Sequence, residues 1–198
     1  MNEKTKLTSN KNPYTLWFVV FAFVAPAVVA YLMYFFGDIR SFTNHGEILN
    51  PVVDISALKL RDEENQLIPR DTLTYKWRII SFVGADCDES CKKRIHDMRQ
   101  IHKSLAKDQH RVIRMIVHLD APSTELNALI AREYPNALNM YGDEKDISSA
   151  LGDSARIHQN ETYIMDPIGN VMMRFTQDQP NQLLLKDLKK LLKVSQIG

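Results

Sequence analysis

The chain has 198 residues, of which 44% are hydrophobic and 25% are charged, and its formal net charge is +1. This near-neutral balance excludes nucleic acid as the main partner, because nucleic-acid binding usually needs a basic field. With only two cysteines, the chain is also not a small scaffold held together by many disulfides.

An uncharged segment near the N-terminus predicts a membrane anchor. Residues 13–37 contain no charged side chain and are mostly apolar or aromatic. A helix of about 20 such residues crosses the hydrocarbon core of a bilayer, so this segment is long enough to span one. The alternative is a cleaved signal peptide, since Ala25-Pro26-Ala27 weakly resembles a cleavage site. The apolar run continues to Phe36, which exceeds a signal core of about 7–15 residues and favours an uncleaved anchor.

The charges that flank this segment predict its orientation. Residues 1–12 carry three lysines and one glutamate, a net charge of +2, whereas Asp38 and Arg40 balance each other after the span. The positive-inside rule makes residues 1–12 a cytoplasmic tail. We therefore expect a single-pass protein of the bacterial inner membrane. Everything after residue 37 is then periplasmic, in a compartment where disulfides can form.

The rest of the chain predicts one α/β domain over residues 72–198, after an irregular lead-in over residues 38–71. Short apolar runs predict strands at residues 77–83, 112–117 and 138–141. Helical patterns alternate with these strands at residues 88–107, 123–132 and 144–151. A hairpin with strands at 162–165 and 171–175 follows, and a helix at 182–194 closes the chain. This β-α-β-α-β-α-β-β-α order is that of the thioredoxin fold.

The two cysteines lie between the first strand of this domain and its helix, in residues 84–91 (GADCDESC). Asp88 is a good N-cap, which places Cys91 in the first helical turn, where free N–H groups and the helix dipole favour a thiolate. The spacing lets the sulfurs of Cys87 and Cys91 reach one point. Three interpretations remain open: a structural disulfide or two inert thiols, thiol–disulfide exchange, and metal binding. Exchange enzymes usually space their cysteines one residue closer, and a metal needs at least one further ligand.

Among the six histidines, His158 is the best candidate for that further ligand. It lies in a polar loop before the predicted strand 162–165. In a thioredoxin-like fold, the loop at this place packs against the active cysteines. It normally carries a cis-proline, but residues 157–162 contain no proline. The other histidines are interpreted mainly as surface groups, although His118 ends a strand and is placed to line a pocket or to cap the sheet.

With these residues in place, the sequence resembles the Sco (SenC) family of copper-assembly proteins for cytochrome c oxidase. The resemblance covers roughly residues 72–194. It rests on a single anchor before a thioredoxin-like domain, on Cys87-x3-Cys91 after an apolar strand, and on His158 eleven residues before Gly169. Family members usually have a proline after each cysteine, where this chain has Asp88 and Lys92. This departure indicates a divergent branch of the family.

The resemblance implies that Cys87, Cys91 and His158 bind one copper ion. Two thiolates suit Cu(I), and an added imidazole accommodates Cu(II) as well. We therefore expect a metallochaperone-like assembly factor whose partner is a cytochrome c oxidase subunit or another copper or thiol protein. One alternative is a thiol–disulfide oxidoreductase, with Cys87 and Cys91 as its catalytic residues, that keeps client cysteines reduced. Another is an assembly module that binds no metal.

Overall fold

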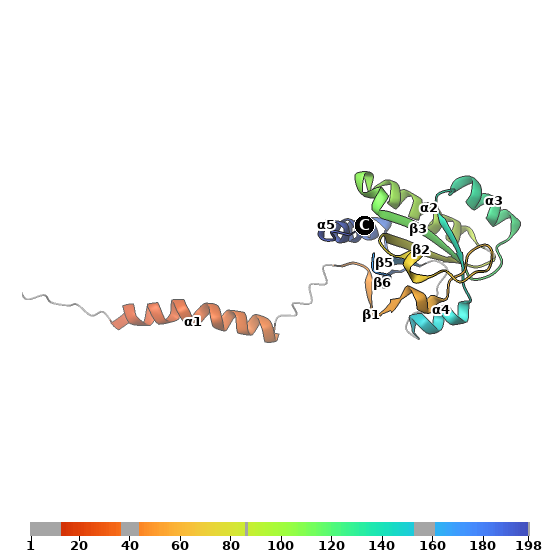
Figure 1. The fold of residues 1–198 in the computed structure, drawn as a ribbon. Helices are drawn as coiled ribbons and strands as arrows, with labels where there is room; N and C mark the ends of the chain where they lie inside the picture. Colours follow the sequence, from red (N-terminus) through yellow and green to blue (C-terminus); the bar gives the residue numbers. More distant parts are fainter. Residues whose placement is uncertain (1–12, 37–43, 86, 153–160, 198) are drawn as a thin grey trace, which may run out of the picture. The chain divides into compact units, whose positions relative to one another are not determined.

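The structure is a computed structural model that describes residues 13–36, 44–85, 87–152 and 161–197 (Figure 1). The chain divides into two compact units, residues 1–43 and residues 44–198. In the described part of the first unit, the secondary structure is helix α1 (Pro13–Phe36). Its segment Tyr14–Tyr34 has a mean hydropathy of 2.3 and is not buried in the structure. Helix α1 therefore has the length and composition of a membrane-spanning helix, as the sequence predicts.

The second unit is built on a six-stranded sheet with the strand order β1-β6-β5-β2-β3-β4. The strands are β1 (Glu47–Asp54), β2 (Trp77–Val83), β3 (Val112–His118), β4 (Leu138–Tyr141), β5 (Thr162–Met165) and β6 (Asn170–Phe175). Strands β2, β3 and β4 are parallel, whereas β5, β6 and β1 extend the sheet in antiparallel pairs. Strand β2 therefore lies in the middle of the sheet, between β3 and β5.

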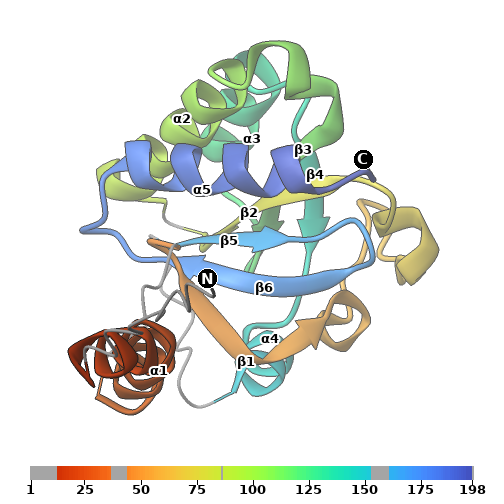
Figure 2. The ribbon, with the colours of Figure 1, turned by 90° about the vertical axis from the view of Figure 1, so that its left-hand side faces the viewer.

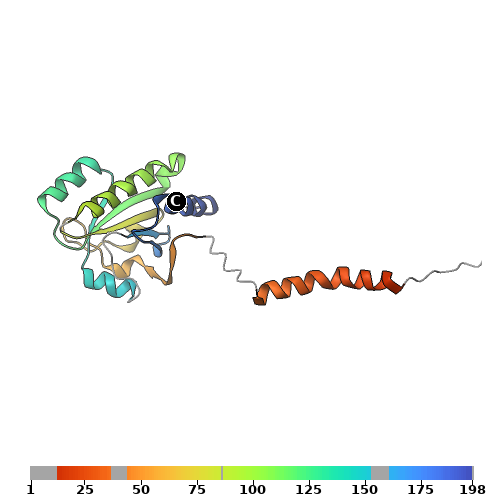
Figure 3. The same ribbon diagram turned by 180° about the vertical axis from the view of Figure 1, so that it is seen from behind.

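Helices cover both faces of this sheet (Figure 2). One face packs against α2 (Glu89–Lys103), α3 (Thr124–Glu133) and α5 (Asn181–Val194). The other face packs against α4 (Glu144–Leu151) and the 3-10 helix η1 (Ile55–Leu58). Figure 3 shows the two helical layers, one on each face of the sheet, from behind. This arrangement confirms the predicted α/β thioredoxin-like fold, with one apolar helix in the N-terminal unit.

Because helices cover both faces of the sheet, β2 consists of a nearly continuous apolar run. Ile79 and Val83 belong to the core on the α2 side of the sheet, whereas Ile80 and Phe82 belong to the core on the α4 side. All four side chains are fully buried. A strand that is buried on both faces has no solvent-facing positions, so it does not alternate between apolar and polar residues.

The segment expected to be an irregular lead-in contains a strand, and this expectation is corrected. Strand β1 pairs with the edge strand β6, with Ile48 opposite Met173 and Val53 opposite Val171. Only Leu49 and Val53 are buried in β1, because it is an edge strand that is largely exposed. Its apolar residues form two adjacent pairs separated by Asn50 and Pro51, so they do not alternate as in a regular half-buried strand. The strand pairs with a partner more than 100 residues later in the chain.

The helix predicted for residues 88–107 is also shorter than expected. Helix α2 ends at Lys103, and a 3-10 helix, η3 (Ala106–Arg111), follows. Ala106 has a φ of 51°, a left-handed conformation that an α-helix does not contain. The His102 ring lies 3.1 Å from the carbonyl oxygen of Gln109 and 2.9 Å from that of Val112, so it holds this turn in place. Because Gln109 and Val112 lie outside the helix, the helical pattern of residues 88–107 does not predict these contacts.

The chain enters the domain through a short segment that is held by a buried carboxylate. Asp187 of α5 is 1% exposed and accepts the backbone N–H groups of His45 and Gly46. Its other oxygen lies 2.8 Å from Nδ1 of His45. Gly46 is required here, because a Cβ at this position would lie 2.6 Å from side-chain atoms of Met173 and Phe175. This anchoring aligns the start of β1 with β6.

Candidate redox and metal site

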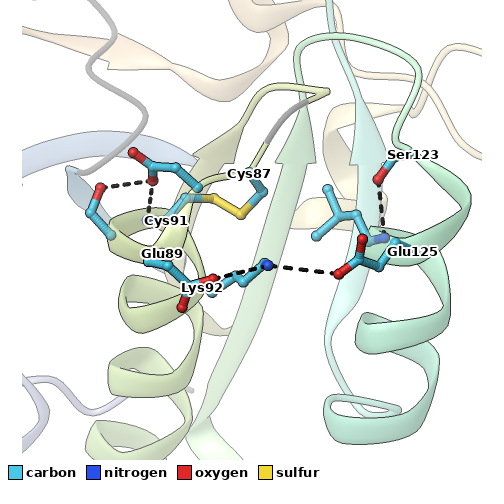
Figure 4. The surroundings of a disulfide bond; sticks show 9 residues. Cys87, Glu89, Cys91, Lys92, Ser123 and Glu125 are labelled. Carbon is cyan, nitrogen blue, oxygen red and sulfur yellow. Dashed lines mark hydrogen bonds and ion pairs between the residues drawn. A yellow bond between two sulfur atoms is a disulfide. The ribbon is translucent and has the colours of Figure 1, made fainter.

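Cys87 and Cys91 form a disulfide at the start of α2, just beyond the carboxyl end of β2 (Figure 4). Their Cα atoms are 5.3 Å apart, an ordinary distance for such a bond. Cys87 is 8% exposed and Cys91 only 1%, so Cys87 is the more accessible of the two. The structure therefore brings together the two predicted thiol residues, at a position in an α/β sheet where ligands commonly bind.

Asp88 begins α2 as its N-cap, as predicted. Its Oδ1 accepts the backbone N–H of Cys91 at 2.8 Å and the hydroxyl of Ser90 at 2.8 Å. The hydrogen bond from the Cys91 backbone, followed by that from Ser90, lowers the pKa of Asp88 below its ordinary value of 3.8. Asp88 is thus held as a carboxylate, and its hydrogen bond places Cys91 in the first turn of α2.

A cavity of about 400 Å³ lies beside Cys87, between α2 and α3. The residues that line it include Cys87, Lys92, Ser123, Glu125, Leu126 and Leu129. Lys92 Nζ is 3.1 Å from Glu89 Oε1 and 3.8 Å from Glu125 Oε1, so one ammonium group bridges the two helices (Figure 4). The hydrogen bond to the Glu89 side chain, followed by the negative charge of Glu89, raises the pKa of Lys92. The disulfide therefore borders a groove with a leucine wall and a charged edge, where Lys92 lies between the carboxylates of Glu89 and Glu125.

The predicted third ligand, His158, falls in residues 153–160 and lies outside the described residues. Across the described ranges, no group of three or more His, Cys, Asp and Glu residues is placed to hold a metal ion. The Asp88 carboxylate is already engaged by hydrogen bonds to Cys91 and Ser90. Of the three copper ligands that the resemblance implies, the structure describes only the two sulfurs. Two soft donors fit Cu(I) once the disulfide is reduced.

His118 lines a different cavity, in agreement with the prediction that it lines a pocket or caps the sheet. Its ring is 2% exposed and stacks on Tyr141, with 5.1 Å between the ring centroids. Burial lowers the pKa of His118, which favours a neutral imidazole. This cavity has a volume of about 430 Å³ and also contains Asp120 and Asp143 among its lining residues.

The sequence pattern does not predict that a groove forms beside the cysteines. Lys92 directly follows Cys91, but a lysine on a helix is usually a solvated residue. Glu125 is an acidic residue on a helix, a type that is usually solvated, and its side chain is 86% exposed. Only the packing of α3 beside α2 brings Glu125, Leu126 and Leu129 to the cysteines. One available signal is Ser123, a residue type favoured at helix N-caps, whose hydroxyl accepts the Leu126 N–H at 3.2 Å.

Together, the fold and the cysteine pair define a thioredoxin-like domain with a disulfide at the junction of its first central strand and first long helix. The chain belongs to the family described as the transmembrane-like, thioredoxin-like, C-terminal domain, whose model matches residues 77–195. Comparison with curated proteins finds no match to this chain.

Several solved structures share this fold, and Sco proteins are prominent among them. Yeast Sco1 with copper bound is 15% identical, with 73% of this chain and 92% of that chain covered and a TM-score of 0.56. BsSco, a member of the Sco family of cytochrome c oxidase assembly proteins with a disulfide switch, is 15% identical, with coverages of 73% and 96% and a TM-score of 0.54. A thiol:disulfide interchange protein from Bacteroides sp. is 12% identical, with coverages of 76% and 91% and a TM-score of 0.51. The resemblance to Sco proteins is thus confirmed in the fold.

Proposed function

We propose that this chain is a membrane-anchored, thiol-active assembly factor that handles copper for cytochrome c oxidase. The observation that carries the proposal is the Cys87–Cys91 disulfide at the start of α2, beside a groove. A purely structural brace is a poorer explanation. The two cysteines are four residues apart, and closing so short a loop removes little entropy from the unfolded chain.

The reduced pair supplies the chemistry of a two-electron exchange. The Cys87 thiolate attacks a disulfide of the client, which forms a mixed disulfide and releases one client thiolate. The Cys91 thiolate then attacks the sulfur of Cys87, which closes the Cys87–Cys91 disulfide and releases the second client thiolate. Two electrons pass from the domain to the client. A dithiol reductant in the same compartment then restores the two thiols. Cys87 takes the attacking role because it is the more exposed cysteine.

Copper enters as cargo of the same pair. The two thiolates suit Cu(I), whereas the disulfide has no thiolate to offer, so the redox state of the pair decides whether copper is loaded. We assign His158 as the third ligand, which extends binding to Cu(II). Support comes from the copper-bound state of yeast Sco1, which has the same fold. The client is then a cytochrome c oxidase subunit, by analogy with the Sco assembly proteins.

Copper titration of the full-length chain in a non-ionic detergent tests this proposal. The reduced protein should bind copper and develop a Cu(II)–thiolate charge-transfer band, and the oxidised protein should bind none. His158→Ala should lose the band. His96→Ala is the matched control, since His96 is an exposed histidine of α2, and it should keep the band. If the reduced wild type neither binds copper nor shows the band, the copper role is wrong.

A thiol–disulfide oxidoreductase that keeps client cysteines reduced is the second candidate. It is favoured by Cys87, which is more exposed than Cys91, and by the groove beside Cys87. Trapping of mixed disulfides in cells separates this function from copper handling. Cys91→Ser leaves the attacking Cys87 without its resolving partner and should accumulate a client adduct, whereas Cys87→Ser should not. Failure of both variants to capture any protein contradicts exchange.

The compartment is part of the proposal. We place residues 1–12 in the cytoplasm, α1 in the inner membrane and the domain in the periplasm, because the +2 tail favours the cytoplasmic side. Alkaline phosphatase fused after Gly198 becomes active only in an oxidising periplasm, so this fusion should be active. A green fluorescent protein fused at the same point and exported by the same route should not fluoresce. The reverse pattern contradicts the orientation.

A further inference from the structure

A third cavity, which is strongly cationic, lies at the end of the sheet opposite the cysteines. Its volume is about 400 Å³. It is lined by Lys76, just before β2, by Val112 and Arg114 at the start of β3, and by the last turns of α2. Because Cys87 follows the other end of β2, this cavity and the disulfide are separate sites.

The charge of this cavity is not balanced by its own residues. Four cations line it: Lys76, Arg99, Lys103 and Arg114. The acidic residue among the lining is Glu133, which already contacts Arg132 at 3.0 Å and Arg99 at 3.6 Å. Cations near the end of a helix offset its dipole, and this accounts for Lys103 in the last turn of α2. It does not account for Arg114, which is on a strand.

Arg114 is the decisive residue. It is 7% exposed, and its Nε and Nη1 atoms are buried without a hydrogen-bond partner among the residues that the structure describes. Buried donors of this kind are rare, because each one gives up its hydrogen bonds to water. Burial lowers the pKa of Arg114, and the positive charge of Arg99 lowers it further. An anion in this cavity would accept the unpartnered donors of Arg114 and offset the repulsion between Arg114 and Arg99.

We propose that this cavity binds a phosphate-type oxyanion through Arg114 and Arg99, with Lys76 and Lys103 at its rim. Guanidinium groups match the oxygens of phosphate with paired, charge-assisted hydrogen bonds. Inorganic phosphate, a phosphate monoester and a phospholipid head group share this chemistry. The site uses neither cysteine and is independent of the function proposed above.

Equilibrium dialysis with radiolabelled inorganic phosphate tests the site on the full-length chain in a non-ionic detergent, at constant ionic strength. The wild type should bind phosphate saturably. Arg114→Gln and Arg99→Gln should each weaken binding by roughly 10- to 100-fold, since each removes charged hydrogen bonds. Arg94→Gln is the matched control. Arg94 is a buried arginine of α2 that donates to the carbonyl of Gln177 instead, so its loss should leave phosphate binding unchanged.

Competition identifies the source of the oxyanion. Displacement of phosphate by glycerol 3-phosphate indicates a soluble ligand, and displacement by short-chain phosphatidylglycerol indicates a lipid head group. A double Cys87→Ser, Cys91→Ser variant should bind phosphate as the wild type does, which separates this site from the redox function. The proposal is overturned if the wild type shows no saturable binding or if both cavity variants bind normally. If Arg114→Gln does not fold, Arg99→Gln decides alone. The side chain of Arg99 is 32% exposed, so we expect its substitution to leave the fold intact.

Discussion

The carboxylate of Asp88 accepts the backbone N–H of Cys91 at 2.8 Å, so a residue between the two cysteines both begins α2 and positions the second sulfur. The resemblance to the Sco family implies a proline at this place. A proline restricts the backbone through its ring, whereas Asp88 restricts it through a hydrogen bond. The residues between the cysteines are therefore ordered by a hydrogen bond to the Asp88 side chain.

The capping role of Asp88 is tested by two substitutions. Asp88→Ala removes the acceptor and should lower the melting temperature of the domain, whereas Asp88→Asn keeps an N-cap and should melt close to the wild type. Thermal unfolding of the full-length chain, followed by circular dichroism in detergent, measures both. Equal destabilisation by alanine and asparagine would show that the cap is not the reason.

The same contact predicts a dependence of stability on pH. The folded state lowers the pKa of Asp88 below 3.8, because the carboxylate accepts the Cys91 N–H. The stabilisation is therefore complete above the unfolded pKa and is lost as the pH falls through the lower, folded value. The difference in melting temperature between the wild type and Asp88→Ala should therefore narrow as the pH is lowered from neutral to about 3. A constant gap between them across this range contradicts the assignment.

Exposure predicts which thiol reacts first. Cys87 is 8% exposed and Cys91 is 1% exposed, so iodoacetamide should modify Cys87 faster after the disulfide is reduced. Timed alkylation followed by peptide mass mapping gives the two rates. Reaction in denaturant is the control and should make the rates similar. Faster modification of Cys91 in the folded protein would reverse the roles assigned to the two sulfurs.

The packing of α5 on the sheet predicts the cost of a core truncation. Leu188 is fully buried in the core shared with α2, and Leu188→Ala should lower the free energy of unfolding by about 2–5 kcal/mol. The neighbouring Lys189 is exposed, and Lys189→Ala should change it by less than about 0.5 kcal/mol. Chemical denaturation of both variants measures the difference. Similar values for the two would contradict the burial of this helix face.

The buried carboxylate at the start of the domain predicts a further cost. Asp187→Ala leaves the N–H groups of His45 and Gly46 without their acceptor, at about 1–3 kcal/mol for each buried group. Asp187→Asn keeps one acceptor oxygen and should be less destabilising. Hydrogen exchange of the His45 and Gly46 amides, which should accelerate in Asp187→Ala, localises the effect. Unchanged exchange would show that these amides are protected by other contacts.

Much of the fold followed from local patterns in the chain. Strand β2 and the β5–β6 hairpin were predicted because their apolar runs are short and bounded by turn residues such as Gly169. The N-cap at Asp88 was predicted because a cap is formed between residues three positions apart. The sequence also marked the cysteine pair, since its place between a strand and a helix is a local feature.

The sequence by itself thus determined the apolar helix α1, the order of the central elements and the pairing potential of Cys87 and Cys91. Only the tertiary structure decided that residues 47–54 form an edge strand, that α3 forms a groove with Cys87, and that Arg114 is buried in a cationic cavity. The physical reason is the separation along the chain between the residues that interact. Periodicity, caps and turns depend on neighbours along the chain, whereas strand pairing, grooves and buried charges depend on segments that meet only after the sheet has assembled.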